Sequence, residues 1–287
     1  MIRSFVLLIR PHQWIKNIII FIPLISTQEY KISSFLICLI GWLIFSFISS
    51  CGYIINDIFD KKNDQKHPEK KNRPIASGKI SIKSSLYLGG FLFLISISLG
   101  IFLNTYFTLM LILYLAFSIL YSFLLKKLMI IDLLVISYLF LFRIISGSIL
   151  IEVSTSIYLL LFSQLFFFSL AGIKRIAEIK VFEDDKKLPG RAYKKINLNM
   201  LKIITTISFT LSVITIIFYI ASNKASNIYI NSNLLYLMCP IISFWFLRMY
   251  NLANKNKIHG DPIIFAIKDK ISLFILIISA IIIYLSV

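Results

Sequence analysis

Long apolar runs separated by shorter polar segments dominate this sequence. The runs lie near residues 15–27, 33–55, 84–103, 105–125, 130–151, 155–173, 201–221, 233–249 and 270–287. Because a transmembrane α-helix needs about 20 predominantly apolar residues, this pattern predicts an all-α chain of about nine membrane-spanning helices. Pro23 interrupts the first run, which membrane helices tolerate. The third and fourth runs are expected to form a tight hairpin across Asn104.

The composition also predicts a polytopic membrane protein. Of the 287 residues, 58% are hydrophobic, and the mean hydropathy is +0.86. A soluble domain cannot bury that much apolar surface. We therefore expect a single transmembrane domain over residues 1–287, embedded in the bilayer. The three cysteines stand in apolar runs at unrelated spacings, which predicts neither a disulfide framework nor a zinc site.

The net charge of +17 would suggest nucleic-acid binding if the protein were soluble. Here the placement of the charges explains it, and we expect no nucleic-acid partner. With a cytoplasmic N-terminus, all but three of the 30 Lys and Arg residues fall on the inside; Lys31 and Lys224 lie in outside loops, and Arg143 lies within the fifth run. The positive-inside rule therefore predicts a cytoplasmic N-terminus, an external C-terminus, and cytoplasmic polar loops at 56–83 and 174–200.

Acidic residues recur at helical spacing directly after the second apolar run. Asp57, Asp60 and Asp64 stand at i, i+3 and i+7, so on a helix they lie within an arc of roughly 60°. A carboxylate costs about 2.5–3.5 kcal/mol at the bilayer centre, and less toward the interface, unless it is paired. Mg²⁺ is a natural partner, because it prefers oxygen ligands and bridges carboxylates to phosphorylated substrates. The alternative is a solvated helix end that faces neighbouring lysines.

The loop that follows this acidic stripe is basic and conformationally restricted. Pro68 and Pro74 restrict its backbone, and Ser77-Gly78 supplies a turn. Arg73, directly before a proline, is well placed to bind a phosphate through its planar guanidinium. The lysines of the loop are expected to set the topology and to contact anionic lipid.

Further polar residues stand at the ends of the runs or within them. Lys16 and Asn17 enter the first run and could reach a phosphate, although Lys16 could equally snorkel. Lys174 and Glu178 stand at i and i+4 and share a helical face, either in a binding site or as a surface ion pair worth about 0.2–0.5 kcal/mol. Arg143, about halfway through the fifth run, should face the bundle interior, where it is paired or lines a cavity.

Two more segments carry candidate chemistry. Asp132 opens the fifth run soon after Tyr121 and Lys126. Asp261 precedes a proline near the C-terminus, where it is either part of a site or a helix cap.

The motif Asn56-Asp57-x-x-Asp60-x-x-x-Asp64 after an apolar helix resembles the UbiA superfamily of intramembrane prenyltransferases. The resemblance covers essentially the whole chain. It implies an all-helical bundle whose central cavity opens to the cytoplasm, with two acidic motifs that hold Mg²⁺ over a diphosphate. The sequence departs from this pattern, because Lys174-x-x-x-Glu178 stands where the second motif is normally Asp-x-x-x-Asp. Exchanging Asp for Lys changes the local charge by about +2, which favours a more highly phosphorylated substrate.

Other motifs resemble one branch of the superfamily, the decaprenyl-phosphate phosphoribosyltransferases. They are Arg10-Pro11-x-Gln13-Trp14-x-Lys16-Asn17, His67-Pro68, Arg73-Pro74-Ile75-Ala76-Ser77-Gly78, Tyr121-Ser122 with Lys126, Lys174-Arg175-x-x-Glu178, Gly260-Asp261-Pro262 and Asp269. The branch implies transfer of phosphoribose from 5-phosphoribosyl 1-diphosphate to a polyprenyl phosphate, with release of diphosphate. It also implies a bacterial inner-membrane protein of cell envelope biosynthesis, with its active site facing the cytoplasm. The lipid length is left open, as is whether the chain forms a homo-oligomer.

The resemblance further implies a role for each motif residue. The residues that would hold Mg²⁺ and the donor diphosphate are Asn56, Asp57, Asp60 and Asp64. The residues that would hold phosphates of donor or acceptor are Lys16, Asn17, Arg73, Lys174 and Arg175. Glu178 would hold ribose hydroxyls or orient Lys174. The further cavity residues would be Tyr121, Lys126 and Arg143.

Two other functions stay open at this point. One is an ordinary superfamily prenyltransferase that moves a prenyl group to an aromatic or other acceptor, against which Lys174 argues. The other is a transporter, which is disfavoured because the charged motifs cluster on one side of the membrane, whereas transporter sites usually lie near the midplane.

Overall fold

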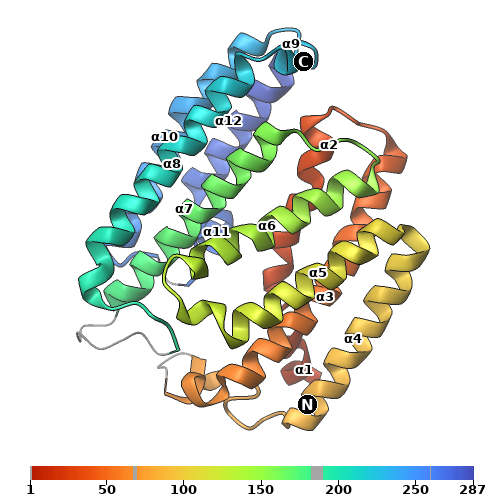
Figure 1. The fold of residues 1–287 in the computed structure, drawn as a ribbon, viewed down its shortest axis with the longest axis vertical. Helices are drawn as coiled ribbons and strands as arrows, with labels where there is room; N and C mark the ends of the chain where they lie inside the picture. The colour runs from red at the N-terminus through yellow and green to blue at the C-terminus, as the bar shows by residue number, and fades with distance from the viewer. Residues whose placement is uncertain (1, 67–69, 182–189, 259) are drawn as a thin grey trace. The chain divides into compact units, whose positions relative to one another are not determined.

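The computed structural model describes residues 2–66, 70–181, 190–258 and 260–287. All regular elements within these ranges are helices, which confirms the all-α prediction (Figure 1). The backbone contacts divide the chain into two compact units: unit 1 comprises Met1–Thr155 and Pro189–Ala192, and unit 2 comprises Ser156–Leu188 and Tyr193–Val287. Each unit buries apolar side chains of its own. The single domain expected over 1–287 stays a prediction.

Unit 1 begins with a broken helical segment instead of a regular helix over 15–27. Arg10 has a left-handed φ of 53°, Pro11 opens a 3-10 helix, and Pro23 lies in the first turn of the next helix. Together the pieces form a candidate span over Arg3–Ser26. The elements of unit 1 are α1 (Ile2–Ile9), η1 (Pro11–Phe21), α2 (Ile22–Ser26), α3 (Ile32–Gln65), η2 (Lys70–Asn72), α4 (Ile82–Leu103), α5 (Thr105–Phe123), η3 (Leu125–Lys127) and α6 (Ile131–Leu150).

Helix α3 is longer than the second apolar run predicts. The run ends near residue 55, but the helix, 34 residues long in all, ends only at Gln65. The first part of the expected loop 56–83 is therefore helical. The sequence has neither Gly nor Pro between Gly52 and Pro68 that would stop it earlier. At 1.5 Å per residue the helix is about 50 Å long, whereas the hydrocarbon core is about 30 Å thick. The last turns, which carry the acidic stripe, therefore extend beyond the apolar layer.

The predicted hairpin across Asn104 is confirmed. The Asn104 side chain caps α5, because its Oδ1 accepts hydrogen bonds from the backbone N–H groups of Tyr106 at 2.8 Å and Phe107 at 3.0 Å. The two helices pack closely beside this turn: a Cβ at Gly100 would lie 2.8 Å from the Thr108 hydroxyl. A small residue at this position lets α4 and α5 approach each other.

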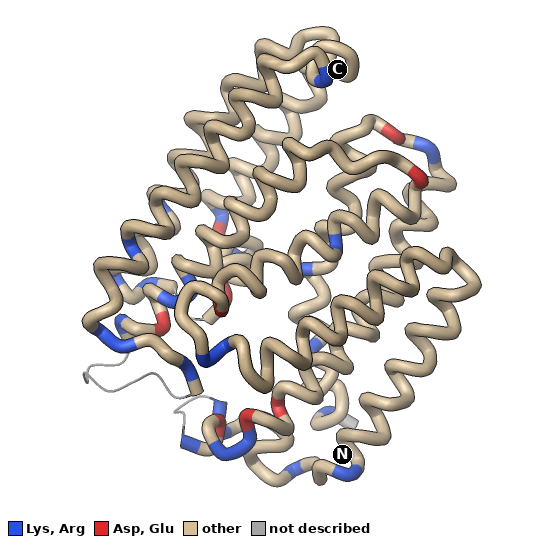
Figure 2. The backbone as a smooth tube through the Cα atoms, viewed as in Figure 1, with Lys and Arg blue, Asp and Glu red and all other residues tan. Residues whose placement is uncertain are grey.

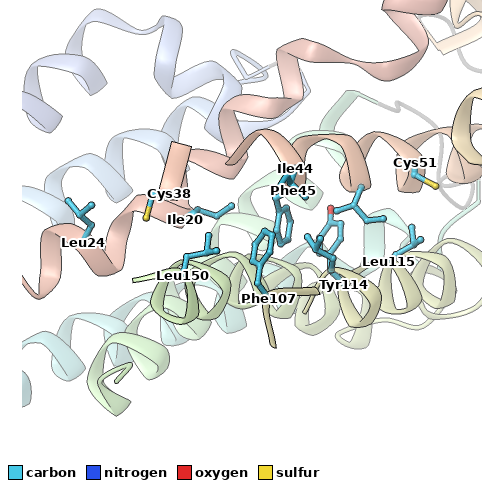
Figure 3. Close-up of a cluster of buried hydrophobic side chains, with 12 residues drawn as sticks. Ile20, Leu24, Cys38, Ile44, Phe45, Cys51, Phe107, Tyr114, Leu115 and Leu150 are labelled. Carbon is cyan, nitrogen blue, oxygen red and sulfur yellow. The ribbon is translucent and has the colours of Figure 1, made fainter. Parts of the chain in front are cut away.

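Apolar side chains from η1, α2, α3, α5 and α6 form a buried cluster in unit 1 (Figure 3). Phe45 of α3 packs against Tyr114 of α5, with ring centroids 4.7 Å apart. Gly147 of α6 lies against the η1 backbone, since a Cβ there would be 2.0 Å from the carbonyl oxygen of Ile20. This close approach fixes α6 on η1 and brings the polar residues of both elements together.

Unit 2 is organised around the closely packed helices α7 and α8. A Cβ at Gly172 of α7 would lie 2.0 Å from the Thr205 hydroxyl of α8. Phe209 of α8 in turn stacks on Phe246 of α10 with ring centroids 3.8 Å apart. The elements are α7 (Ile157–Val181), η4 (Lys195–Asn197), α8 (Leu198–Ile220), α9 (Asn223–Ser226), η5 (Ser232–Leu237), α10 (Met238–Asn254), α11 (Pro262–Lys268) and α12 (Lys270–Ser286).

Eight helical segments of the described chain are long and apolar enough to span a membrane, and they correspond to the first eight predicted runs. The ninth run forms α12, which has 17 residues. The expected loop 174–200 begins later than predicted, because α7 continues to Val181; residues 182–189 lie outside the described ranges. The chain is thus a multi-pass membrane protein.

Candidate active site

Two of the three aspartates of α3, Asp57 and Asp64, form ion pairs with arginines of unit 1. Arg73 Nη1 lies 3.1 Å from Asp57 Oδ1 and 2.7 Å from Asp64 Oδ2. A single guanidinium can bridge these carboxylates because residues i and i+7 face the same side of the helix, as their spacing predicts. Arg10 forms a second ion pair with Asp57. Figure 2 shows the acidic and basic positions that gather where α3 ends.

The local backbone explains how both arginines reach α3. Arg73 follows the short helix η2, and the loop after it folds back through a hydrogen bond of 3.1 Å from Ile80 N to the Pro74 carbonyl. Arg10 stands at the left-handed junction before η1, and its guanidinium carbon lies 5.6 Å from the centre of the Tyr53 ring. The sequence predicts Arg73 as a site residue but not Arg10. Arg10 is marked only by its place in the N-terminal motif.

Asp60 pairs with Lys126 of the short helix η3. Lys126 Nζ lies 2.5 Å from Asp60 Oδ1, and only 5% of the lysine side chain is exposed. Burial lowers the pKa of Lys126, and the neighbouring Asp60 carboxylate opposes this shift. Lys126, which the resemblance makes a cavity residue, therefore lies directly on the acidic stripe.

A further buried carboxylate of unit 1, Asp132, lies in the first turn of α6. The Tyr121 hydroxyl donates to its Oδ1 at 2.9 Å. Arg191 Nη1 lies 3.0 Å from the same oxygen and 2.9 Å from the Tyr121 hydroxyl. Sequence reasoning misses Arg191, because nothing in the sequence links it to an aspartate 59 residues earlier.

A small polar pocket opens between the stripe and this cluster. Its volume is about 20 Å³, which is room for a water molecule or a metal ion but not for a diphosphate. Carboxylates and basic side chains face each other across it, so a larger anion can enter only if some of these ion pairs open. The lining residues are Asp60, Asn63, Asp64, Lys70, Lys126, Gly190 and Arg191.

The donor atoms on α3 fit a divalent cation. Asp57 Oδ2 is buried and has no hydrogen-bond partner, which is costly for a carboxylate oxygen and is relieved by a hard cation. Asn56, half-buried, directly precedes it. Among the described residues no three His, Cys, Asp or Glu side chains are already grouped as metal ligands. A bound cation would therefore have to replace some of the arginine and lysine contacts.

A separate polar network lies within the spans of unit 1. Arg143 Nε donates to Asn17 Oδ1 at 2.7 Å, and its Nη2 donates to the Tyr114 hydroxyl at 3.1 Å. Asn17 also donates to two serines of α3. Arg143 thus faces the interior as expected, surrounded by neutral groups and aromatic rings. Lys16, next to Asn17, is 9% exposed. Asn17 is hydrogen-bonded to Arg143 and not to the acidic stripe.

In unit 2 the predicted motif at the end of α7 forms two ion pairs. Lys174 Nζ lies 3.1 Å from Asp261 Oδ2, and Arg175 Nη1 lies 2.7 Å from Glu178 Oε2. The Arg175 side chain is fully buried. Asp261 also caps α11, since its Oδ1 accepts a hydrogen bond from Ile263 N at 3.2 Å. The predicted helix cap at Asp261 is therefore confirmed.

Asp269 caps α12 and is clamped by an arginine. Its carboxylate accepts from Ser272 N at 2.9 Å, and Arg248 donates to both carboxylate oxygens at 2.7 and 2.9 Å. These hydrogen bonds, with Arg248 the largest contributor, lower the pKa of Asp269 to about 2. The Asp269 side chain is therefore ionised at neutral pH and is held in place by Arg248.

The sequence matches the UbiA prenyltransferase family over residues 18–278. This chain belongs to that family. Curated relatives include the uncharacterized protein y4nM of Sinorhizobium fredii, which is 33% identical over 93% of this chain and 52% of its own length. The chain thus spans about half the length of that relative. Decaprenyl-phosphate phosphoribosyltransferase of Mycolicibacterium smegmatis is 27% identical over 92% of this chain and 86% of its own length.

A solved UbiA structure shares the fold. The UbiA homologue of Archaeoglobus fulgidus, bound to GPP and Mg²⁺, is 15% identical with a TM-score of 0.74, covering 99% of this chain and 98% of the homologue. The first acidic motif of the sequence, Asn56 to Asp64, lies entirely on α3. On α7, however, Lys174 is tied to Asp261, and the only carboxylate of the second motif, Glu178, is tied to Arg175.

Proposed function

We propose that this UbiA-family protein transfers the 5-phosphoribosyl group of 5-phosphoribosyl 1-diphosphate to a polyprenyl phosphate. The reaction depends on Mg²⁺ and releases diphosphate. The proposal is supported by the name of the relatives at 27–29% identity and by the residues of both motifs.

The observation that carries the proposal is the basic second motif. Lys174 and Arg175 stand side by side on α7, where Lys174 pairs with Asp261 and Arg175 pairs with Glu178. A prenyl diphosphate carries one phosphorylated end, whereas phosphoribosyl diphosphate carries a further 5-phosphate. Two adjacent cations suit that extra dianion through charge-assisted hydrogen bonds. In unit 1 the small pocket likewise has three cations, Lys70, Lys126 and Arg191, facing two carboxylates.

The chemistry needs no protein nucleophile. An oxygen of the lipid phosphate, already ionised at neutral pH, forms a bond to the anomeric carbon of the donor. The bond from that carbon to the diphosphate oxygen breaks, and diphosphate leaves with the electron pair. The product is a polyprenyl-phosphoryl ribose 5-phosphate. The protein must therefore position two anions close together and stabilise the charge of the leaving group.

The residues take the following roles in this proposal. Mg²⁺, which neutralises charge on the diphosphate when bound, would be held by Asn56, Asp57, Asp60 and Asp64. Glu178 holds ribose hydroxyls or orients Lys174, and apolar helix faces take the isoprenoid tail. Phosphate groups of donor and acceptor are bound by Lys16, Asn17, Arg73, Lys174 and Arg175. The remaining cavity residues are Tyr121, Lys126 and Arg143.

We further propose a bacterial inner-membrane location with the N-terminus and the active site on the cytoplasmic side. This orientation follows from the distribution of Lys and Arg. A cytoplasmic site also gives access to a soluble sugar-phosphate donor.

Diphosphate release tests the proposal. Purified protein with Mg²⁺ should release diphosphate only when phosphoribosyl diphosphate and a polyprenyl phosphate are both present. Release from geranyl diphosphate and an aromatic acceptor would favour the second candidate, an ordinary UbiA prenyl transfer. That candidate is favoured by the structural likeness to the homologue bound to GPP and Mg²⁺. Consumption of neither donor would contradict both transfer reactions.

A further inference from the structure

Asp132, Tyr121 and Arg191 make a three-way contact at the edge of the acidic pocket in unit 1. Arg191 Nη1 lies 3.0 Å from Asp132 Oδ1 and 2.9 Å from the Tyr121 hydroxyl, and that hydroxyl lies 2.9 Å from the same carboxylate oxygen. The Asp132 side chain is fully buried, and the Arg191 side chain is 18% exposed. Groups from α5 and α6 therefore fix the position of an arginine that comes from a distant part of the sequence.

The backbone beside Arg191 lies close to helix α3. Gly190 has a φ of +73°, and a Cβ on it would lie 3.0 Å from Asn63 Nδ2 of α3. A side chain at position 190 would be both strained and crowded. Gly190 and Arg191 line the same pocket as Asp60 and Lys126. Gly190 and Arg191 therefore form one wall of that pocket.

The chemistry of this wall suits a phosphate. A guanidinium has five N–H donors in a rigid fork, so one amino group can bind Asp132 and Tyr121 while the rest of the side chain binds an anion. The fixed carboxylate preorganises the fork, which reduces the entropy lost on binding. Lys126 supplies a second cation across the pocket, next to Asp60. A phosphorylated ligand that displaces Asp60 from Lys126 would meet cations on both sides.

We propose that Arg191 binds the diphosphate group of the donor in this pocket, and that Asp132 and Tyr121 are positioning residues that hold Arg191 in place. The inference deepens the proposed function by naming a residue that recognises the donor. It needs only a diphosphate ligand, which phosphoribosyl and prenyl donors share.

Binding of inorganic diphosphate with Mg²⁺ to the purified full-length protein, measured by calorimetric titration, tests this assignment. Arg191→Gln should weaken binding about 10- to 100-fold, because it removes charge-assisted hydrogen bonds. Arg191→Lys should recover part of the lost affinity, since the positive charge remains but the planar guanidinium is lost. Lys194→Gln removes the same charge from an exposed site three residues away and should leave the Kd unchanged.

The positioning residues are tested with the same ligand. Asp132→Asn should weaken diphosphate binding by about tenfold, and Tyr121→Phe by less, because the ion pair to Arg191 survives the loss of the hydroxyl. Wild-type affinity in Asp132→Asn, beside weak binding in Arg191→Gln, would overturn the positioning role. Wild-type affinity in both Arg191 variants, with only a lowered melting temperature, would show that Arg191 merely neutralises Asp132 and would overturn the whole inference.

The same titration separates this inference from the proposed function. Phosphoribosyl diphosphate and geranyl diphosphate are titrated as separate ligands. If wild-type protein binds geranyl diphosphate but not phosphoribosyl diphosphate, the proposed donor is wrong, while the loss of affinity in Arg191→Gln still supports the role of Arg191. If phosphoribosyl diphosphate binds equally to wild type and Arg191→Gln, the donor stands and the inference about Arg191 fails.

Discussion

The Arg73 guanidinium lies 2.7 Å from the Asp64 carboxylate and makes an ion pair with it. The same guanidinium also reaches Asp57, seven residues earlier on α3. An arginine therefore occupies carboxylate oxygens that are suited to a divalent cation. In the proposed function, binding of the donor with Mg²⁺ moves Arg73 from carboxylate to phosphate.

The acidic stripe should be essential for turnover. Asp57→Asn and Asp60→Asn keep the size of the side chain but remove the charge that a metal ion needs, so we expect diphosphate release to fall at least 100-fold, equivalent to about 2.7 kcal/mol. Expression and monodispersity on gel filtration should be preserved. Glu29→Gln, in the loop between α2 and α3, is the matched control and should stay active. Full activity in either aspartate variant would remove α3 from the metal site.

Lys174 should be required for binding the donor. Lys174→Asp should abolish phosphoribosyl transfer while the protein remains folded. The pair with Asp261 is partly exposed, so its loss costs about 1 kcal/mol, and solvent screens the repulsion between the new carboxylate and Asp261. The double variant Lys174→Asp with Asp261→Lys restores an ion pair but moves the cation to another element. We expect it to remain inactive in a transfer assay. Recovery of activity in the double variant would mean that the Lys174–Asp261 pair is only structural.

The sequence predicts local features of the site better than its long-range contacts. The shared face of Asp57 and Asp64 follows from helical spacing alone, and a proline neighbour singles out Arg73. By contrast, the partners Arg10 and Arg191 lie 47 residues from Asp57 and 59 from Asp132. Such pairings depend on how helices pack, which no local pattern encodes.

The sequence also predicts where the helices lie better than where they end. The apolar runs locate the spans, but hydropathy marks where a helix leaves the apolar layer and not where its hydrogen bonds end. Helix α3 therefore continues to Gln65 and α7 to Val181, beyond their predicted ends. In the first span the breaks at Arg10 and Pro23 come from backbone geometry, of which only the prolines are visible in the sequence.

Close packing of α6 on η1 should be intolerant of a single methyl group. Gly147→Ala would place its Cβ 2.0 Å from the carbonyl oxygen of Ile20, a backbone atom that cannot easily move. We expect a loss of about 1–3 kcal/mol or more from overpacking, seen as a lower melting temperature in detergent. Gly90→Ala, in α4 with nothing within 4 Å of the added Cβ, is the control. It should melt at the wild-type temperature or slightly above it, because Ala favours a helix interior over Gly by about 0.5–1 kcal/mol. A Gly147→Ala variant that melts at the wild-type temperature would contradict the packing described here.

The Arg248–Asp269 pair should give unit 2 a pH-dependent stability. The pKa of Asp269 is lowered from 3.8 to about 2 in the folded protein, so the stabilisation is fully present above about pH 4 and is lost as the pH falls toward 2. Arg248→Gln should lower the stability at pH 7 by about 1 kcal/mol, since the pair is partly exposed. The difference from wild type should shrink below pH 4.

Thermal unfolding of wild type and variant, followed from about pH 7 down to about pH 3, measures this effect. Lys255→Gln, an exposed lysine near the end of the same helix α10, controls for the change in net charge. A stability difference that does not change with pH would show that Arg248 acts by packing and not through the ionised carboxylate.

Transfer of labelled phosphoribose into lipid tests the central claim most directly. Purified protein is incubated with Mg²⁺, radiolabelled 5-phosphoribosyl 1-diphosphate and a polyprenyl phosphate, and the mixture is extracted with organic solvent. We predict label in the lipid phase that depends on the protein and disappears with EDTA. No label in the lipid phase across several lipid lengths, while geranyl diphosphate is consumed with an aromatic acceptor, would contradict the proposed reaction.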